Sequence, residues 1–334
     1  MTSERLGNGA TTGVGSLPHR DEVVAANFAL DSMSIPAMPT LPRRSPAEGM
    51  ITQAVVGIHG ITVGQYGSIA VDVGRISTTH DVVTDLQHDA FGGFRAFLTE
   101  AAKRPPQRVK WQIVGPVTLG VALLRAGVPE HLAFDVAIRA VRSHVANLLD
   151  AVETALPGVE QIVFIDEPSM KAVSEPGFPL APDTAIDLVS GALAAIEPRA
   201  VSGLHCCADA DWAPLIATGP QILGVPVRSS VVESAGYLNQ FLGRGGVVAW
   251  GVVPTDGPIP TTAERPWRQL TALWCEMVNR GCDQIQLRQQ AIVTPECGMG
   301  LHSPSVADRV HRITAEVGRR VHDQAMATRF VLGA

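Results

Sequence analysis

The sequence predicts an α/β fold, a single-domain (β/α)8 barrel, and two observations carry this prediction. From about residue 109 onward, short apolar runs alternate with helical stretches, a pattern typical of a parallel sheet that is buried on both faces. Counting such runs along the whole chain gives about eight strands, the number in a (β/α)8 barrel. A doubly wound open sheet is the alternative arrangement of the same units.

The first hundred residues are less regular than the rest. The expected elements are a strand at 12–16, a helix at 21–32, and a helix at 81–102 that leads back to the repeating units. Residues 36–42 are so rich in proline that we expect at most a short strand followed by a loop. The glycine-rich segment 57–74 predicts an excursion, either a hairpin or a lid, and we expect residues 1–11 to be flexible.

Beyond residue 109, strands and helices alternate regularly. The expected strands span 109–114, 161–165, 200–206, 222–227, 246–253 and 284–288. The expected helices span 117–125, 131–156, 182–196, a short stretch near 212, 233–242, 262–280 and 305–327. Because the carboxyl ends of parallel strands form one face of a barrel, polar residues at these ends would converge on a single active site.

The composition excludes several classes of protein. Hydrophobic residues make up 46% of the 334 residues, enough for a large core, and the net charge of −6 argues against nucleic acid or an anionic membrane as the partner. No apolar run is long enough to span a bilayer, and the polar start lacks the apolar segment of a signal peptide. Five unevenly spaced cysteines indicate reduced thiols, so we expect a cytoplasmic protein.

A possible metal site is formed by residues that follow two of the expected strands. His205 and Cys207 are two apart, so on a strand they point to one face while Cys206 points to the other. Cys297 can join them if the fold brings the two strand ends together. One nitrogen and two sulfur ligands with a position left open suit a catalytic zinc. The alternative is that these cysteines simply fill a core.

Other polar residues lie near the same strand ends. Asp166 and Glu167 can bind a substrate cation or relay a proton, although a carboxylate here can also cap the next turn. Gly15 and Ser16 can bind an anion through backbone N–H groups, or they form a tight turn that requires glycine. Gln112 lies near the end of its strand and is a further substrate-binding candidate.

Five motifs, taken in order, resemble the catalytic C-terminal domain of cobalamin-independent methionine synthase over nearly the whole chain. They are TGVGSLP at 12–18, GPVT at 115–118, IDEP at 165–168, HCC at 205–207 and PECG at 295–298. That domain belongs to a barrel superfamily that also contains uroporphyrinogen decarboxylase and zinc-dependent thiol methyltransferases. The resemblance implies a zinc-dependent enzyme that moves a methyl group to a small thiol, with homocysteine as the acceptor.

The resemblance also implies the ligands of the zinc ion, which are His205, Cys207 and Cys297. The family's fourth ligand is a glutamate that ends the strand after His-x-Cys, but here residues 222–228 contain no acid. The candidates for the fourth position are therefore Glu233, His302, water and the substrate itself.

The resemblance further implies how the amino-acid end of the substrate is bound. The backbone at Gly15-Ser16 would meet the carboxylate, and Asp166 would pair with the ammonium. The family's second glutamate for the ammonium falls within a segment that corresponds to 49–74, which contains none here. The methyl donor would be a folate or a corrinoid protein, because the folate-binding N-terminal domain of the long methionine synthases has no counterpart in this sequence.

Two other functions remain open from the sequence. A decarboxylase that resembles the uroporphyrinogen enzymes would need no metal and would gather arginines around its substrate's carboxylates; Arg43 and Arg44 are a hint of this. A non-catalytic barrel that binds a metal or a corrinoid is the other alternative. Bound zinc would separate the methyltransferase from the decarboxylase, and turnover with a methyl donor would separate it from the non-catalytic barrel.

Overall fold

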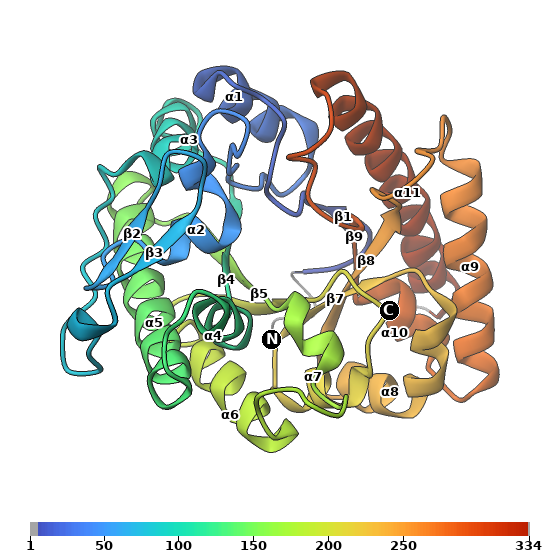
Figure 1. Cartoon of the computed structure of the whole chain (residues 1–334). Helices are drawn as coiled ribbons and strands as arrows, with labels where there is room; N and C mark the ends of the chain where they lie inside the picture. The colour runs from blue at the N-terminus through green and yellow to red at the C-terminus, as the bar shows by residue number, and fades with distance from the viewer. Residues whose placement is uncertain (1–5, 333–334) are drawn as a thin grey trace.

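A sheet of seven parallel strands forms the centre of the computed structural model, which describes residues 6–332. The spatial order of the strands is β1, β9, β8, β7, β6, β5 and β4. Their bounds are β1 Ala10–Thr11, β4 Arg108–Val114, β5 Glu160–Asp166, β6 Val201–His205, β7 Ile222–Pro226, β8 Val247–Val253 and β9 Ala291–Pro295. The sheet curls into a barrel with helices around it (Figure 1), which confirms the predicted α/β barrel fold.

The segment 35–40 lies between the two edge strands, β1 and β4, and completes the ring of eight. It pairs through three isolated parallel bridges, Thr12 with Ile35, Ser16 with Thr40, and Ala37 with Lys110. Prolines lack a backbone N–H donor, so this proline-rich segment cannot form a continuous ladder. The count of about eight strands is therefore met, with one of them reduced to isolated bridges.

Helices cover the outside of the barrel. The α-helices are α1 Glu22–Ser32, α2 Met50–Ala54, α3 Gly92–Lys103, α4 Pro116–Arg125, α5 Glu130–Ala155, α6 Pro182–Leu193, α7 Trp212–Ala217, α8 Ala235–Gly243, α9 Glu264–Asn279, α10 Gln284–Gln289 and α11 Pro304–Leu332. Short 3₁₀ helices occupy Pro46–Glu48, Val73–Arg75, Asp89–Phe91, Pro168–Ala172 and Ser229–Ser234. Within residues 6–332, every helix is too short or too polar to cross a membrane.

Two separate hydrophobic cores result from the alternation of side chains along the strands. The larger core fills the space between the sheet and the helices. The smaller core fills the inside of the barrel, and its members include Leu6, Ile35, Ile162, Phe164, Val201, Ile222, Val247, Ala249 and Ile292. The next residues on the inner face, toward the carboxyl ends of the strands, include Gln112, Asp166 and His205. The inner core is thus the floor on which the polar site rests.

Two expected elements are wrong. The segment 284–288 alternates polar and apolar residues like a strand, but it forms helix α10, whose N-terminus is capped by the Asp283 side chain that accepts hydrogen bonds from the next turn. The last strand is instead β9, seven residues later. The helix expected from residue 81 begins only at Gly92, because helix α5 holds the preceding segment: Ser143 donates to the carbonyl of Val82, and His144 is hydrogen-bonded to the hydroxyl of Thr84.

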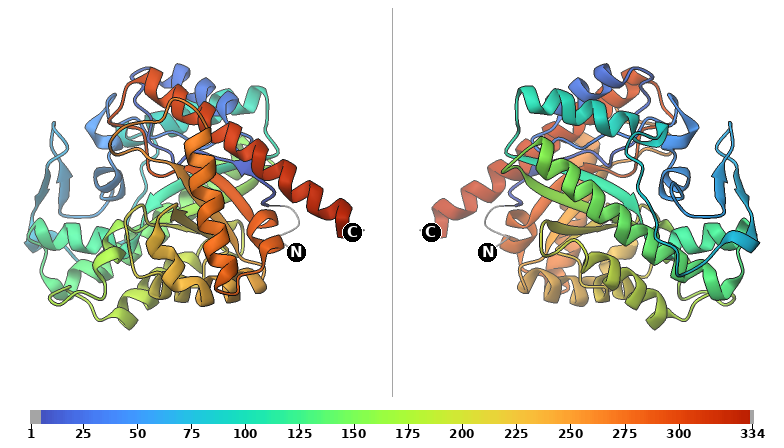
Figure 2. Two further views of the ribbon diagram at one scale, coloured as in Figure 1. Left: turned by 90° about the vertical axis from the view of Figure 1, so that its right-hand side faces the viewer. Right: turned by 90° about the vertical axis from the view of Figure 1, so that its left-hand side faces the viewer.

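The predicted excursion is a β-hairpin. Strands β2 (Ile61–Val63) and β3 (Ile69–Val71) pair antiparallel, apart from the barrel sheet. Figure 2 shows this hairpin standing out from the rest of the molecule. Residues 6–11, which we expected to be flexible, lie within the barrel structure: Leu6 is fully buried and β1 pairs with β9. Residues 1–5 lie outside the part of the chain that the structure describes.

Candidate active site

A cavity of about 660 Å³ lies at the carboxyl ends of the strands. Six of the residues singled out from the sequence line it, namely Ser16, Gln112, Asp166, His205, Cys207 and Cys297. They come from five different strand ends or the loops that follow them, as expected for a barrel active site. Its volume is in the range that binds small molecules. The other two, Gly15 and Glu167, lie behind the cavity wall.

The three candidate metal ligands converge. One ligand atom from each of His205, Cys207 and Cys297 lies within 4.8 Å of the other two. His205 is the last residue of β6, and its Nδ1 faces Gly224 of β7, where an added Cβ would approach to 2.8 Å. The buried Nε2 atom has no hydrogen-bond partner in the structure. A free imidazole nitrogen beside two sulfur atoms matches the donor set that zinc prefers.

The two thiols of this cluster are coupled. The neighbouring Cys297, followed by His205, lowers the pKa of Cys207 to about 4. The hydrogen bond to Cys207, together with burial, raises the pKa of Cys297. Of the two thiols, Cys207 is therefore the one that loses its proton more readily. A thiolate is the form of cysteine that binds metals.

The third cysteine of the motif takes no part. Cys206 is fully buried among the helices that pack on the outside of the sheet, as the alternation along a strand predicts. Burial raises the pKa of its thiol to about 12. The motif thus contributes one cysteine to the site and one to the outer core.

Asp166 ends β5 beside His205, its partner in the strand ladder. Its Oδ1 atom is buried and has no hydrogen-bond partner in the structure. Burial raises the pKa of this carboxyl, while the nearby charges of His205 and Lys110 oppose the shift. An unpaired buried carboxylate oxygen on a cavity wall is suited to bind a cationic group of a ligand.

Glu167 has a different environment from Asp166. It is fully buried, and its carboxylate accepts hydrogen bonds from the backbone N–H groups of Val117 and Thr118, both at 2.8 Å, and from the Thr118 hydroxyl at 2.6 Å. It thereby caps the N-terminus of α4, the helix that Gly115 and Pro116 open. Burial raises its pKa to about 7. These hydrogen bonds give Glu167 a structural role as the cap of α4. Its catalytic role stays a prediction.

Gly15 and Gln112 fit closely together. Gly15 has φ 141°, a conformation that favours glycine, and a Cβ at this position would lie 2.0 Å from Gln112 Nε2. The neighbouring Ser16 accepts hydrogen bonds through its carbonyl from Met299 and through its hydroxyl from Gly300. The TGVGS segment is therefore packed between the end of β4 and the loop that carries Cys297.

Sequence reasoning missed Lys110. Its side chain is 2% exposed and its ammonium lies inside the barrel, donating to the carbonyl of Val14 and to Gln112 Oε1. Burial lowers its pKa to about 8, and the charge of Asp166 opposes this shift. The available signal was a lysine in an apolar strand, two residues from Gln112 and therefore on the same face.

An ion pair stands where the family's fourth ligand was expected. Arg228, two residues beyond β7, donates from Nε to Glu296 Oε1 at 2.8 Å, and its second nitrogen also binds this oxygen. Of the other candidates, Glu233 is exposed and His302 lines the cavity, but neither belongs to the cluster of ligand atoms. Within the described residues, the protein offers three ligands to a metal at this site.

The arginines that hinted at a decarboxylase have other partners. Arg43 donates a hydrogen bond to the carbonyl of Leu301, and Arg44 forms ion pairs with Glu22, Glu48 and Asp89. Glu48 itself is 1% exposed on the cavity wall, one residue before the segment in which the family's second glutamate falls. Its carboxylate is committed to Arg44 and to backbone N–H groups. The described lining contains one arginine, Arg228, so it does not form a site for several carboxylates.

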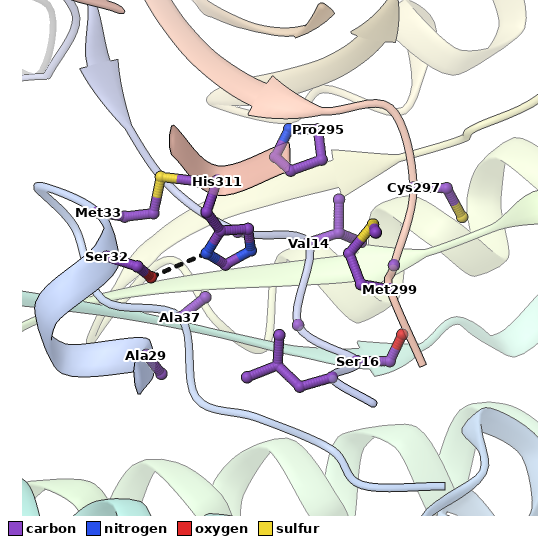
Figure 3. Close-up of a pocket in the computed structure, with 14 residues that line it drawn as sticks. Val14, Ser16, Ala29, Ser32, Met33, Ala37, Pro295, Cys297, Met299 and His311 are labelled. Carbon is purple, nitrogen blue, oxygen red and sulfur yellow. Dashed lines mark hydrogen bonds between the residues drawn. The ribbon is translucent and has the colours of Figure 1, made fainter. Parts of the chain in front are cut away.

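A second, very small pocket lies behind the wall formed by Val14 and Ser16 (Figure 3). Its volume of about 10 Å³ matches a single water molecule. His311 borders it, bonded to Ser32 at 2.8 Å, and burial lowers the His311 pKa to about 4. In Figure 3 the side chain of Cys297 points away from this ring. This small pocket is therefore separate from the active-site cavity and does not enlarge it.

These features define a class of protein, a barrel of parallel strands with a His/Cys/Cys cluster that could bind a metal such as zinc. Among solved structures, the fold is similar to that of a B12-independent methionine synthase from Shewanella sp. W3-18-1 in complex with selenomethionine. The TM-score is 0.62 at 16% identity, over 96% of this chain and 99% of that one.

Other comparisons add little. A fungal β-1,4-galactanase matches with a TM-score of 0.32 at 12% identity, over 65% of this chain and 90% of that one. No protein-family model matches the sequence, and no curated protein is significantly similar to it. The comparisons thus show a fold like that of the methionine synthase.

Proposed function

We propose that this protein is a zinc-dependent methyltransferase that acts on a small thiol, with homocysteine as the acceptor. The observation that carries the proposal is the convergence of His205, Cys207 and Cys297 within 4.8 Å on the wall of a 660 Å³ cavity. The likeness of the fold to that of a methionine synthase solved with selenomethionine supports it.

The chemistry requires a thiolate at neutral pH. A free thiol has a pKa near 8.5, and zinc, when bound, would deprotonate a coordinated thiol outright. His205, Cys207 and Cys297 would hold the ion through one neutral imidazole and two thiolates, which nearly balance its charge. With three protein ligands, one position stays open for the acceptor sulfur.

The remaining cavity residues would orient the acceptor. Asp166, with its unpaired Oδ1, would bind the ammonium of an amino acid, and Ser16 and Gln112 would meet the carboxylate. The exposed side chains of Met50 and Leu301 also line the cavity, and there they would contact a methyl donor. The donor that we propose is a folate or a corrinoid protein, and the chain's partners are this donor and the thiol.

The experiment that tests the proposal is metal analysis of the purified, untagged protein. About one zinc per chain, lost in a Cys207→Ala variant, is the expected result. Transfer of a methyl group to homocysteine from methylated folates, or from a methylcorrinoid protein, is then measured. A protein that binds no zinc after reconstitution under reducing conditions would overturn the proposal. A zinc protein that transfers no methyl group would be a non-catalytic binding barrel.

A further inference from the structure

The ammonium of Lys110 is buried and its hydrogen-bond partners are neutral groups. It lies inside the barrel, 4.9 Å from the centre of the Phe164 ring, and the nearby charge of Asp166 favours its charged form without a direct ion pair among residues 6–332. Its partners are two oxygen atoms, the Val14 carbonyl and Gln112 Oε1, the latter at 2.8 Å. Burying a charge without a direct ion pair is costly, and Asp166 offsets this cost only in part, so a position of this kind calls for a functional explanation.

The two hydrogen bonds have a direct effect on the cavity wall. An ammonium only donates hydrogen bonds, so the group that faces Lys110 must be the oxygen of the Gln112 amide. The amide nitrogen is then the free end, and it lies against the backbone of Gly15. The second hydrogen bond holds the carbonyl of Val14, within the segment that leads to Ser16. Gln112 and Ser16 both line the cavity.

We propose that Lys110 is a positioning residue that orients the Gln112 amide and the 13–16 segment toward the carboxylate of a zwitterionic thiol or thioether substrate. This inference rests on the proposed function, in which Asp166 binds the ammonium of the same substrate. The site then distinguishes the two ends of the ligand by charge. The carboxylate of Asp166 binds the ammonium, and the amide N–H of Gln112 binds the carboxylate. Without Lys110, the amide is free to rotate and to present its oxygen to the carboxylate.

The test uses the zinc-loaded full chain and two ligands that differ in one group. Calorimetry measures binding of L-methionine and of 3-(methylthio)propylamine, which lacks the carboxylate. In Lys110→Met, which removes the charge at similar length, we expect methionine to bind about tenfold more weakly or worse, with little change for the amine. Equal weakening of both ligands would show a merely structural role and overturn the proposal.

The matched control is Lys103→Met, because Lys103 is 63% exposed and does not line the cavity. It should leave both affinities unchanged. If Lys110→Met does not fold, Gln112→Leu removes the acceptor of the same Lys110–Gln112 hydrogen bond. This variant should also bind methionine more weakly, with little change in its affinity for the amine. If Gln112→Leu still binds methionine as tightly, relative to the amine, as the wild-type protein does, the proposal is overturned.

A further readout separates this inference from the proposed function. Hydrogen exchange of the backbone amides of residues 12–17, together with a crystal structure of Lys110→Met, needs no ligand. We expect faster exchange and a rotated Gln112 side chain; unchanged exchange and an unrotated amide overturn the positioning role. Failure of wild-type protein to bind methionine overturns the substrate class and the proposed acceptor, whatever these two measurements show.

Discussion

The cap that Glu167 provides for helix α4 gives a prediction with a magnitude that the structure sets. In Glu167→Ala, three donors lose their acceptor: the N–H groups of Val117 and Thr118 and the Thr118 hydroxyl. The side chain is 0% exposed, so water does not replace it freely. Leaving buried donors without a partner costs about 1–3 kcal/mol each, and the losses overlap within one network, so we expect about 4 kcal/mol of destabilisation.

The assay is thermal unfolding followed by calorimetry. For a chain of this length, about 4 kcal/mol corresponds to a decrease of roughly 6 °C in the melting temperature. Glu130→Ala is the control, because Glu130 also lies in the first turn of a helix but is exposed. A melting temperature that falls by less than about 1 °C in Glu167→Ala would refute the reasoning that this carboxylate holds the helix.

A second variant, Glu167→Gln, distinguishes the two interpretations of Glu167. If the residue only caps the helix, Glu167→Gln keeps one acceptor oxygen and should retain most of its activity at temperatures where it is folded. If Glu167 relays a proton, the same substitution abolishes turnover without a matching loss of stability. The comparison of melting temperature with rate therefore decides whether the catalytic prediction for this residue stands.

Three other predictions concern metal, pH and ligand binding. Cys297→Ser should sharply lower the zinc content with an unchanged circular dichroism spectrum, and wild-type zinc content would remove Cys297 from the site. Burial lowers the pKa of His144 to about 4 from 6.5, so its neutral ring stabilises the fold fully above pH 6.5, and up to about 3 kcal/mol is lost as the pH falls toward 4. Urea unfolding at pH 7 and pH 4.5 should show a smaller loss in His144→Gln; an equal loss would contradict this assignment. Gly15→Ala should displace Gln112 and weaken methionine binding at least fivefold, whereas Gly158→Ala, also at a positive φ but with open space around it, should not.

The strands from residue 108 to 253 could be predicted because each is a short apolar run that is followed by a helix. The error at 284–288 has a local cause, since a six-residue helix capped by Asp283 carries the same alternation as a strand. The error at 81–91 has a distant cause. His144, on helix α5, holds the side chain of Thr84, and no local pattern shows a contact between residues 60 positions apart.

The candidate metal ligands could be predicted because chemistry and strand position indicated the same residues. Lys110 could not be predicted as part of the site, because its meaning depends on which neighbours the closed barrel brings to it. The ion pair between Arg228 and Glu296 could not be predicted for the same reason. The sequence shows that no acidic residue ends the strand β7, but it does not show that Arg228, which follows this strand, pairs with Glu296 after β9. Interactions between strand ends are set by the curvature of the sheet.

The segment 35–40 has a consequence for how the molecule responds to mechanical force. Strands β4 and β5 are in register over seven residue pairs, whereas this segment pairs with each of its neighbours only at isolated bridges. Because backbone hydrogen bonds share a shearing load, the line between this segment and β4, which has a single bridge, is the weakest seam of the ring. A molecule pulled between residues on either side of this seam should rupture there first, and the barrel would unroll as a sheet before its remaining strands separate.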